Sequence, residues 1–304
     1  MKQPSHRVSI LMALLVTFLW STSFILIKWG LAEIPPITYA GLRYGLAALC
    51  FLPVILRPAY RSKLSALDQK QWGQLLLLGL IFYTLTQGFQ FLGLSLLPAV
   101  AVSLMLNFTP IIVAGMGWMM LSERPSSLQW LGGTLFMMGV LLYFLPVSTE
   151  GTRLLGIMVM IGGVLANAGA TVLGRGINRD RNIHPIVVTF ISMSFGAILL
   201  LATGLIMDGI PVIGRTNLLY LIWLAVVNTA LAFTLWNVAL RSLSAFETSI
   251  INGTMLIQIA VLAWIFLGEA ITLKEGAGMA LAAVGAWLAQ RKQEITAKTR
   301  RAQR

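Results

Sequence analysis

This 304-residue chain has one cysteine, two histidines and few charged residues. The single cysteine, Cys50, excludes an intramolecular disulfide. The sequence has no metal-ligand cluster, no P-loop and no spaced aspartate pair for prenyl diphosphates. Charged residues make up only 11% of the chain and hydrophobic residues 58%, which excludes an ordinary soluble domain. We therefore expect no catalytic centre, no metal and no cofactor.

Long apolar runs fill most of the chain. A helix needs about 20 apolar residues to cross a hydrocarbon layer of ~30 Å. These runs are continuously apolar, whereas the strands of a membrane barrel would alternate. The sequence therefore predicts an all-α membrane protein with ten transmembrane helices. The expected spans lie at about 8–27, 36–56, 72–94, 99–121, 127–145, 154–174, 185–207, 217–240, 244–267 and 273–290.

The net charge of +12 follows the expected topology and does not indicate nucleic-acid binding. If the N-terminus is cytoplasmic, 17 of the 22 basic residues fall in inside segments, four fall in outside loops and Arg43 lies within a span. Basic residues resist translocation. We therefore expect a multi-pass protein of the cell inner (cytoplasmic) membrane with both termini in the cytoplasm. The basic tail, residues 291–304, can also touch anionic lipid.

The second half of the chain repeats the first. Residues 94–142 align with residues 240–288 at a constant offset of 146, with thirteen identities that include Trp118/Trp264 and Glu123/Glu269. Five spans per repeat would make the second repeat enter the membrane from the opposite side, as in many secondary transporters whose substrate site lies at the repeat interface. The predicted organisation is two inverted five-helix repeats, 1–147 and 148–290, followed by the tail.

The repeated turn carries a recognisable pattern. Residues 121–125 (Leu-Ser-Glu-Arg-Pro) precede Gly132, Gly133 and Gly139, and residues 267–272 (Leu-Gly-Glu-Ala-Ile-Thr) precede Gly278 and Gly285. Together with residues 20–23 (Trp-Ser-Thr-Ser) and 107–110 (Asn-Phe-Thr-Pro), this chain resembles EamA-type transporters of the drug/metabolite transporter superfamily over nearly its whole length. The resemblance implies ten helices around a central cavity and export or exchange of small metabolites. One departure is Leu256, where the second repeat often has a proline matching Pro110.

Arg43 is the sharpest single signal, because a charged residue within a span is unfavourable by at least ~2.5 kcal/mol and usually faces a bundle interior or water. Two interpretations stay open: a structural arginine bound to helix-end carbonyls or snorkelling to the surface, and a ligand for a substrate carboxylate or phosphate.

Polar stripes on several spans could line a wet cavity, although hydrogen bonds between helices explain any single stripe equally well. Tyr83, Gln87 and Gln90 share one helical face. The other candidate substrate-binding residues are Trp20, Ser23, Tyr39, Asn107, Asn167, Asn228, Trp236, Asn252 and Gln258.

Glu123 and Glu269 sit in equivalent short turns, where an acid can bind amides or favour a helix dipole. We assign both, with Pro110, a structural role rather than proton transfer. Thr272 and Glu275 have the spacing of a capping box.

The predicted function is a secondary transporter that exports or exchanges small metabolites by alternating access, with amino acids or related compounds as the leading class. The alternatives are an intramembrane enzyme acting on lipid or isoprenoid substrates, which the missing acidic motif disfavours, and a passive facilitator or channel. The expected partners are a small-molecule substrate and the lipid bilayer, with no nucleic acid, and the protein is expected to be a monomer or homodimer.

Overall fold

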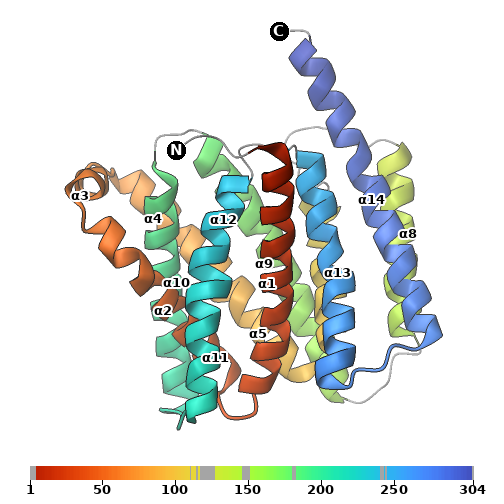
Figure 1. Cartoon of the computed structure of the whole chain (residues 1–304), viewed down its shortest axis with the longest axis horizontal. Helices are drawn as coiled ribbons and strands as arrows, with labels where there is room; N and C mark the ends of the chain where they lie inside the picture. Colours follow the sequence, from red (N-terminus) through yellow and green to blue (C-terminus); the bar gives the residue numbers. More distant parts are fainter. Residues whose placement is uncertain are drawn as a thin grey trace. The chain divides into compact units, whose positions relative to one another are not determined.

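The structure, a computed structural model, describes residues 5–109, 111–113, 116, 127–145, 151–179, 183–239, 243 and 245–302. Within these ranges it is helical and has no strand (Figure 1). Pro110 and Glu123 lie outside the described residues. In chain order the elements are α1 (His6–Gly30), α2 (Pro36–Ile55), α3 (Pro58–Ser65), α4 (Gln69–Leu78), η1 (Gly79–Thr86), α5 (Gln87–Leu96), α6 (Ala99–Leu106), α8 (Ser127–Phe144), α9 (Gly151–Arg179), α10 (Pro185–Asp208), α11 (Arg215–Ala225), η2 (Val226–Leu231), α12 (Ala232–Ala239), α13 (Ala245–Leu267) and α14 (Leu273–Ala302).

Six helical segments in the described ranges are long and apolar enough to cross a membrane. They are α1, α2, the continuous run α4–η1–α5, the apolar part of α9, α10, and the run from α11 into α12. Shorter apolar stretches begin in α6 and lie within α8 and α13. This is the helix content of a multi-pass membrane protein. The count of ten spans stays a prediction, because the expected fourth span includes residues outside the described ranges.

The chain divides into two compact units that do not follow the two sequence repeats. Unit 1 contains residues 1–25, 98–154 and 234–304, and unit 2 contains residues 26–97 and 155–233. Each unit therefore combines segments from both repeats. The predicted repeat boundary near residue 147 stays a sequence-based prediction.

In unit 2, α2 and α10 pack so closely that their backbones come together at two glycines. A methyl group added at Gly41 would lie 2.6 Å from the amide nitrogen of Leu201, and one added at Gly204 would lie 2.6 Å from that of Thr38. As the position on α2 moves back from 41 to 38, its partner on α10 moves forward from 201 to 204. The two helices therefore run antiparallel. Both begin at prolines, Pro36 and Pro185. Proline is favoured at the first helical position because an amide there has no partner within the helix, so its missing N–H loses no hydrogen bond.

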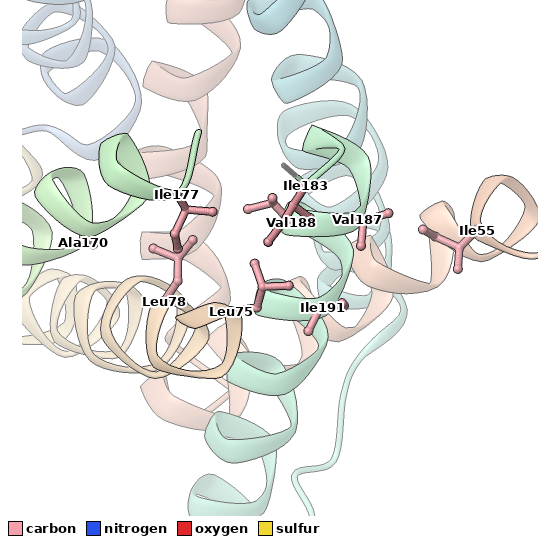
Figure 2. Close-up of a cluster of buried hydrophobic side chains, with 9 residues drawn as sticks. All are labelled: Ile55, Leu75, Leu78, Ala170, Ile177, Ile183, Val187, Val188 and Ile191. Carbon is pink, nitrogen blue, oxygen red and sulfur yellow. The ribbon is translucent and has the colours of Figure 1, made fainter. Parts of the chain in front are cut away.

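An apolar cluster lies between several helices of unit 2 (Figure 2). Its members come from the ends of α2, α4, α9 and α10 and from the residue before His184. The buried members are Ile55, Leu75, Leu78, Ala170, Ile177, Ile183, Val187, Val188 and Ile191. The cluster therefore joins α2, α4, α9 and α10.

The short helix α3 was not expected from the sequence and packs beside this cluster. Its Tyr60 ring meets the His184 imidazole edge-on, with centroids 5.1 Å apart. His184 in turn caps α10, because its Nδ1 accepts a hydrogen bond from the Ile186 amide at 3.3 Å. Burial, and then the charge of Lys63, hold the pKa of His184 below its ordinary value. The neutral imidazole is therefore the form that supports this helix end.

In unit 1, glycines let α8 and α14 approach at backbone distance, and Figure 1 shows the two helices side by side. A methyl group added at Gly139 would lie 2.5 Å from the Gly278 carbonyl oxygen, and one added at Gly285 would lie 2.6 Å from that of Gly132. In the repeat, Gly139 is equivalent to Gly285 and Gly132 to Gly278, so the two contacts exchange with each other. Small residues permit such approach where lipid gives helices no hydrophobic drive to associate.

The third span of each repeat contains a π-helical segment at an equivalent position. The first of these, η1, covers residues 79–86, and η2 covers residues 226–231, which the offset of 146 maps to 80–85. Threonine hydroxyls bind carbonyls five residues back in both: Thr86 Oγ1 donates to Ile81 O at 2.9 Å, and Thr229 Oγ1 to Leu224 O at 2.8 Å. π segments are rare and often mark functional sites.

Candidate functional site

Arg43 lies on α2 and is buried, with 5% of its surface exposed. Its Nε donates a hydrogen bond to Thr229 Oγ1 of η2 at 3.0 Å, and its guanidinium carbon lies 5.3 Å from the centre of the Tyr44 ring. The structure thus places this cation inside unit 2, between α2 and η2. The snorkelling interpretation of Arg43 does not fit this burial, because a snorkelling side chain carries its charge to water.

Tyr44 connects the arginine to the third span of the first repeat. Its hydroxyl donates to Gln87 Oε1 at 2.6 Å, and its ring meets the Tyr83 ring edge-on at 5.5 Å between centroids. Tyr44, Tyr83 and Gln87 are all buried. Gln90, one turn further along α5, is half-buried. That Arg43, Tyr83, Gln87 and Gln90 border one substrate cavity stays a prediction from the sequence; the structure shows Arg43, Tyr83 and Gln87 each in contact with Tyr44.

The two π segments contact neighbouring residues of α2. Tyr83 of η1 contacts Tyr44, and Thr229 of η2 contacts Arg43. If the offset of 146 is extended back from residue 94, Tyr83 pairs with Thr229, since 229 − 146 = 83. The second span of the first repeat therefore meets the same position of both third spans. We call Arg43, Tyr44, Tyr83, Gln87 and Thr229 the arginine cluster.

Three other predicted residues of unit 2 lie near these helices. Tyr39 is fully buried, its hydroxyl donates to the Leu26 carbonyl at 3.4 Å, and its ring packs edge-on against Phe91. Asn228 is fully buried in η2, next to Thr229. Asn167 is half-buried on α9, where its backbone carbonyl accepts from Thr171. Their predicted substrate contact stays a prediction.

A second polar group lies in unit 1, between α1 and α13. Gln258 Oε1 accepts from Ser21 Oγ at 2.9 Å, and Gln258 Nε2 donates to Thr254 Oγ1 at 3.0 Å and to Thr17 Oγ1 at 3.4 Å. The Trp20 and Trp236 rings lie 5.0 Å apart between centroids. Gln258 uses both its oxygen and its amino group to join these helices, which is the interhelical role left open by the sequence.

The remaining candidates of unit 1 are dispersed. Ser23 is buried and donates to the Leu19 carbonyl at 3.3 Å. Asn107 ends α6, where its Nδ2 donates to the Ser103 carbonyl at 2.9 Å. Asn252 on α13 is exposed. Ser23 and Asn107 thus each bond a backbone carbonyl of their own helical segment.

Glu269 binds amides, as an acid in such a turn can, but they belong to a different helix from the one that follows it. Its Oε1 accepts from the Ala99 amide at 2.8 Å and its Oε2 from the Val100 amide at 3.4 Å. These are the first two amides of α6, whose preceding residue Pro98 supplies no side-chain cap. Gly268, at φ +66°, supplies the left-handed turn between α13 and Glu269. The structure therefore supports a role in holding helix ends.

The residues that follow Glu269 form the predicted capping box. The Thr272 amide donates to Glu275 Oε2 at 2.8 Å, and the Glu275 amide donates to Thr272 Oγ1 at 3.2 Å. This predicted start of the last helix is confirmed.

Sequence reasoning missed Tyr44 and Thr229. Tyr44 was not singled out, although its position next to Arg43 was a signal. Thr229 could have been found by extending the repeat alignment back into the third spans, where it pairs with Tyr83. The chemistry of the whole cluster is hydrogen bonding and charge, which suits recognition of a ligand rather than covalent catalysis.

Comparison with known proteins gives a consistent family. Two copies of the family model described as the EamA-like transporter family match residues 7–145 and 154–290. A Bacillus subtilis protein named uncharacterized transporter YvbV is 28% identical, over 92% of this chain and 91% of its own length. Proteins named probable amino-acid metabolite efflux pump from Salmonella typhimurium and Escherichia coli are 26% and 25% identical, each over 91% of this chain and 93% of its own.

A solved crystal structure shares the fold. It superposes with a TM-score of 0.61 over 93% of this chain and 97% of its own, at 17% sequence identity. At that identity the likeness extends to the fold alone.

Proposed function

Because this chain belongs to the EamA-like transporter family, we propose that it is a carrier that exports or exchanges small metabolites bearing a carboxylate, with amino acids and related compounds as the leading class. Transport would proceed by alternating access. The family and the named relatives point to a transporter rather than an enzyme.

The observation that carries the proposal is the buried guanidinium of Arg43 within the arginine cluster. A guanidinium has only hydrogen-bond donors and pairs best with a carboxylate or phosphate, often through two parallel bonds. Gln87 adds a second group: its oxygen is bound by Tyr44, so its amino group, also a donor, is what it can offer a ligand. Two donors favour a ligand rich in acceptors.

The choice of amino acids over other carboxylates is supported by two of the relatives, whose names describe amino-acid metabolite efflux. Specificity would follow from burial. A ligand that lacks a matching acceptor leaves buried donors unpaired, at about 1–3 kcal/mol for each group. An amino acid would therefore be accepted where its amide is rejected.

The proposed architecture is ten spans in two inverted repeats, in the inner membrane, with both termini in the cytoplasm and a monomer or homodimer as the working form. As the position on α8 moves back from 139 to 132, its partner on α14 moves forward from 278 to 285, so these two equivalent helices run antiparallel, which supports an inverted relation. Reporter fusions should place the turn at Glu123 inside the cell and the turn at Glu269 outside. Both turns on one side would contradict the inversion.

The function is tested with purified protein in liposomes. Thermal stabilisation by the twenty common L-amino acids and their amides identifies a ligand, and counterflow of that labelled ligand then measures transport. A carrier gives saturable counterflow with the acid preferred over the amide, whereas a passive facilitator gives none. Arg43→Lys keeps the charge but loses the planar fork, so it should weaken acid recognition and still insert. The substrate class is wrong if wild-type protein does not prefer acid to amide.

A further inference from the structure

Thr229 holds Arg43 at one defined atom. Its hydroxyl donates to the Leu224 carbonyl at 2.8 Å and accepts from Arg43 Nε at 3.0 Å. A hydroxyl has one hydrogen, so donating it to the carbonyl directs the oxygen lone pairs toward the arginine. Thr229 is fully buried, which keeps water from competing for either bond.

The π segment explains why this hydroxyl is available in that direction. In an α-helix a threonine bonds carbonyls three or four residues back. In η2 the hydroxyl of Thr229 reaches the carbonyl five residues back. In η1 the Thr86 hydroxyl makes the same kind of bond, to the Ile81 carbonyl at 2.9 Å. Thr229 is therefore a π threonine bonded to Arg43, and Thr86 is a matched π threonine bonded to the carbonyl of its own helix.

We propose that Thr229 is a positioning residue that sets the plane of the Arg43 guanidinium for carboxylate recognition. A guanidinium can bind both oxygens of a planar carboxylate through two parallel bonds from its Nη1–Nη2 edge. When Thr229 holds Nε, this edge faces one fixed direction. This inference rests on the proposed function and deepens it. The preference for acid over amide would then depend on the Thr229 hydroxyl as well as on the positive charge of Arg43.

The test compares four proteins in the liposome assay: wild type, Thr229→Val, Thr229→Ser and Thr86→Val. The probe is the L-amino acid that stabilises wild-type protein most, with its amide as the competitor. Thr229→Val should reduce the preference for acid over amide by about 10-fold or more, the size expected for charge-assisted hydrogen bonds. Thr229→Ser, which keeps the hydroxyl, should restore it. Thr86→Val removes the matched bond in η1 and should leave the preference unchanged.

A double-mutant cycle separates positioning from general damage. If Thr229 acts through Arg43, Thr229→Val should change the preference little in an Arg43→Lys background, because lysine has no Nε donor at that place. Additive losses would overturn the inference, as would a Thr229→Val protein that keeps the wild-type preference or a Thr86→Val protein that loses it equally. If Thr229→Val does not fold, Thr229→Ala removes the same hydroxyl with less crowding. Wild-type protein without any acid preference would instead refute the proposed function.

Discussion

Replacing Glu269 with glutamine tests how the repeated acidic turn works. The carboxylate accepts from the Ala99 amide at 2.8 Å and from the Val100 amide at 3.4 Å, at a helix start that has no side-chain cap of its own. Glutamine keeps one acceptor oxygen but turns an amino group toward the other amide. It also removes the negative charge from the N-terminus of α6.

The magnitude follows from these two losses. A hydrogen bond to a charged group exceeds a neutral one by about 1 kcal/mol. The charge–dipole term adds about 0.3–1 kcal/mol. Because the second bond is long, we expect Glu269→Gln to destabilise the folded protein by about 1.5–2 kcal/mol. The yield of folded protein should fall while the pH dependence of transport stays unchanged.

Unfolding curves in detergent and the monodisperse yield measure this effect. Glu275→Gln is the matched control. Glutamine serves as well as glutamate at this position of a capping box, so the substitution should change stability by only about a few tenths of a kcal/mol. Glu123, outside the described residues, holds the equivalent place in the first repeat, so Glu123→Gln should lower yield similarly. Normal stability of Glu269→Gln combined with lost pH-dependent transport would refute the structural role and indicate proton transfer.

Three further changes test other parts of the structure. Gly278→Ala places a methyl group 2.7 Å from the Gly139 carbonyl oxygen and should destabilise by about 1–3 kcal/mol in thermal melts, while Gly253→Ala, with open space around it, should not. The pKa of His184 is lower in the folded protein than in the unfolded chain, where it is about 6.5. The stability that His184 contributes is therefore present above about pH 6.5 and is lost as the pH falls through the folded pKa. His184→Asn, which caps the helix without titrating, should remove this pH dependence from a series of thermal melts. Gln87→Leu should change the acid preference and also destabilise by about 1–3 kcal/mol by orphaning the Tyr44 hydroxyl, so that adding Tyr44→Phe restores stability but not preference.

Sequence patterns predicted most helix positions because hydropathy, prolines and caps act locally. The starts at Pro36 and Pro185 and the Thr272–Glu275 box are where the sequence placed them. The π segments were not predicted, because one extra residue in a turn does not alter an apolar run. Their effect is nevertheless large, since they bring Thr229 onto Arg43.

The candidate site was predicted in part for the same reason. Arg43, Tyr83 and Gln87 stand out as polar groups in apolar spans, and the structure connects them through Tyr44. Thr229 is 186 residues from its partner Arg43, and Glu269 is 170 residues from Ala99. Pairings at such separations depend on packing between spans, which a single sequence does not specify. By hydropathy alone leucine at position 87 suits a span, and the buried Tyr44 hydroxyl that it would leave without its acceptor is visible only in the structure.

The composition of the two compact units has a consequence for how the chain is made. Unit 1 requires residues 1–25 and 98–154 together with residues 234–304, so it cannot close until the last helix has left the ribosome. During synthesis the glycine face of α8 must wait in lipid or against the insertion machinery for Gly278 and Gly285 of α14. A premature stop codon late in the gene would therefore leave α8 in the membrane without its partner α14. Degradation of such a product would then be triggered by a helix of the first half, although the defect lies in the second half.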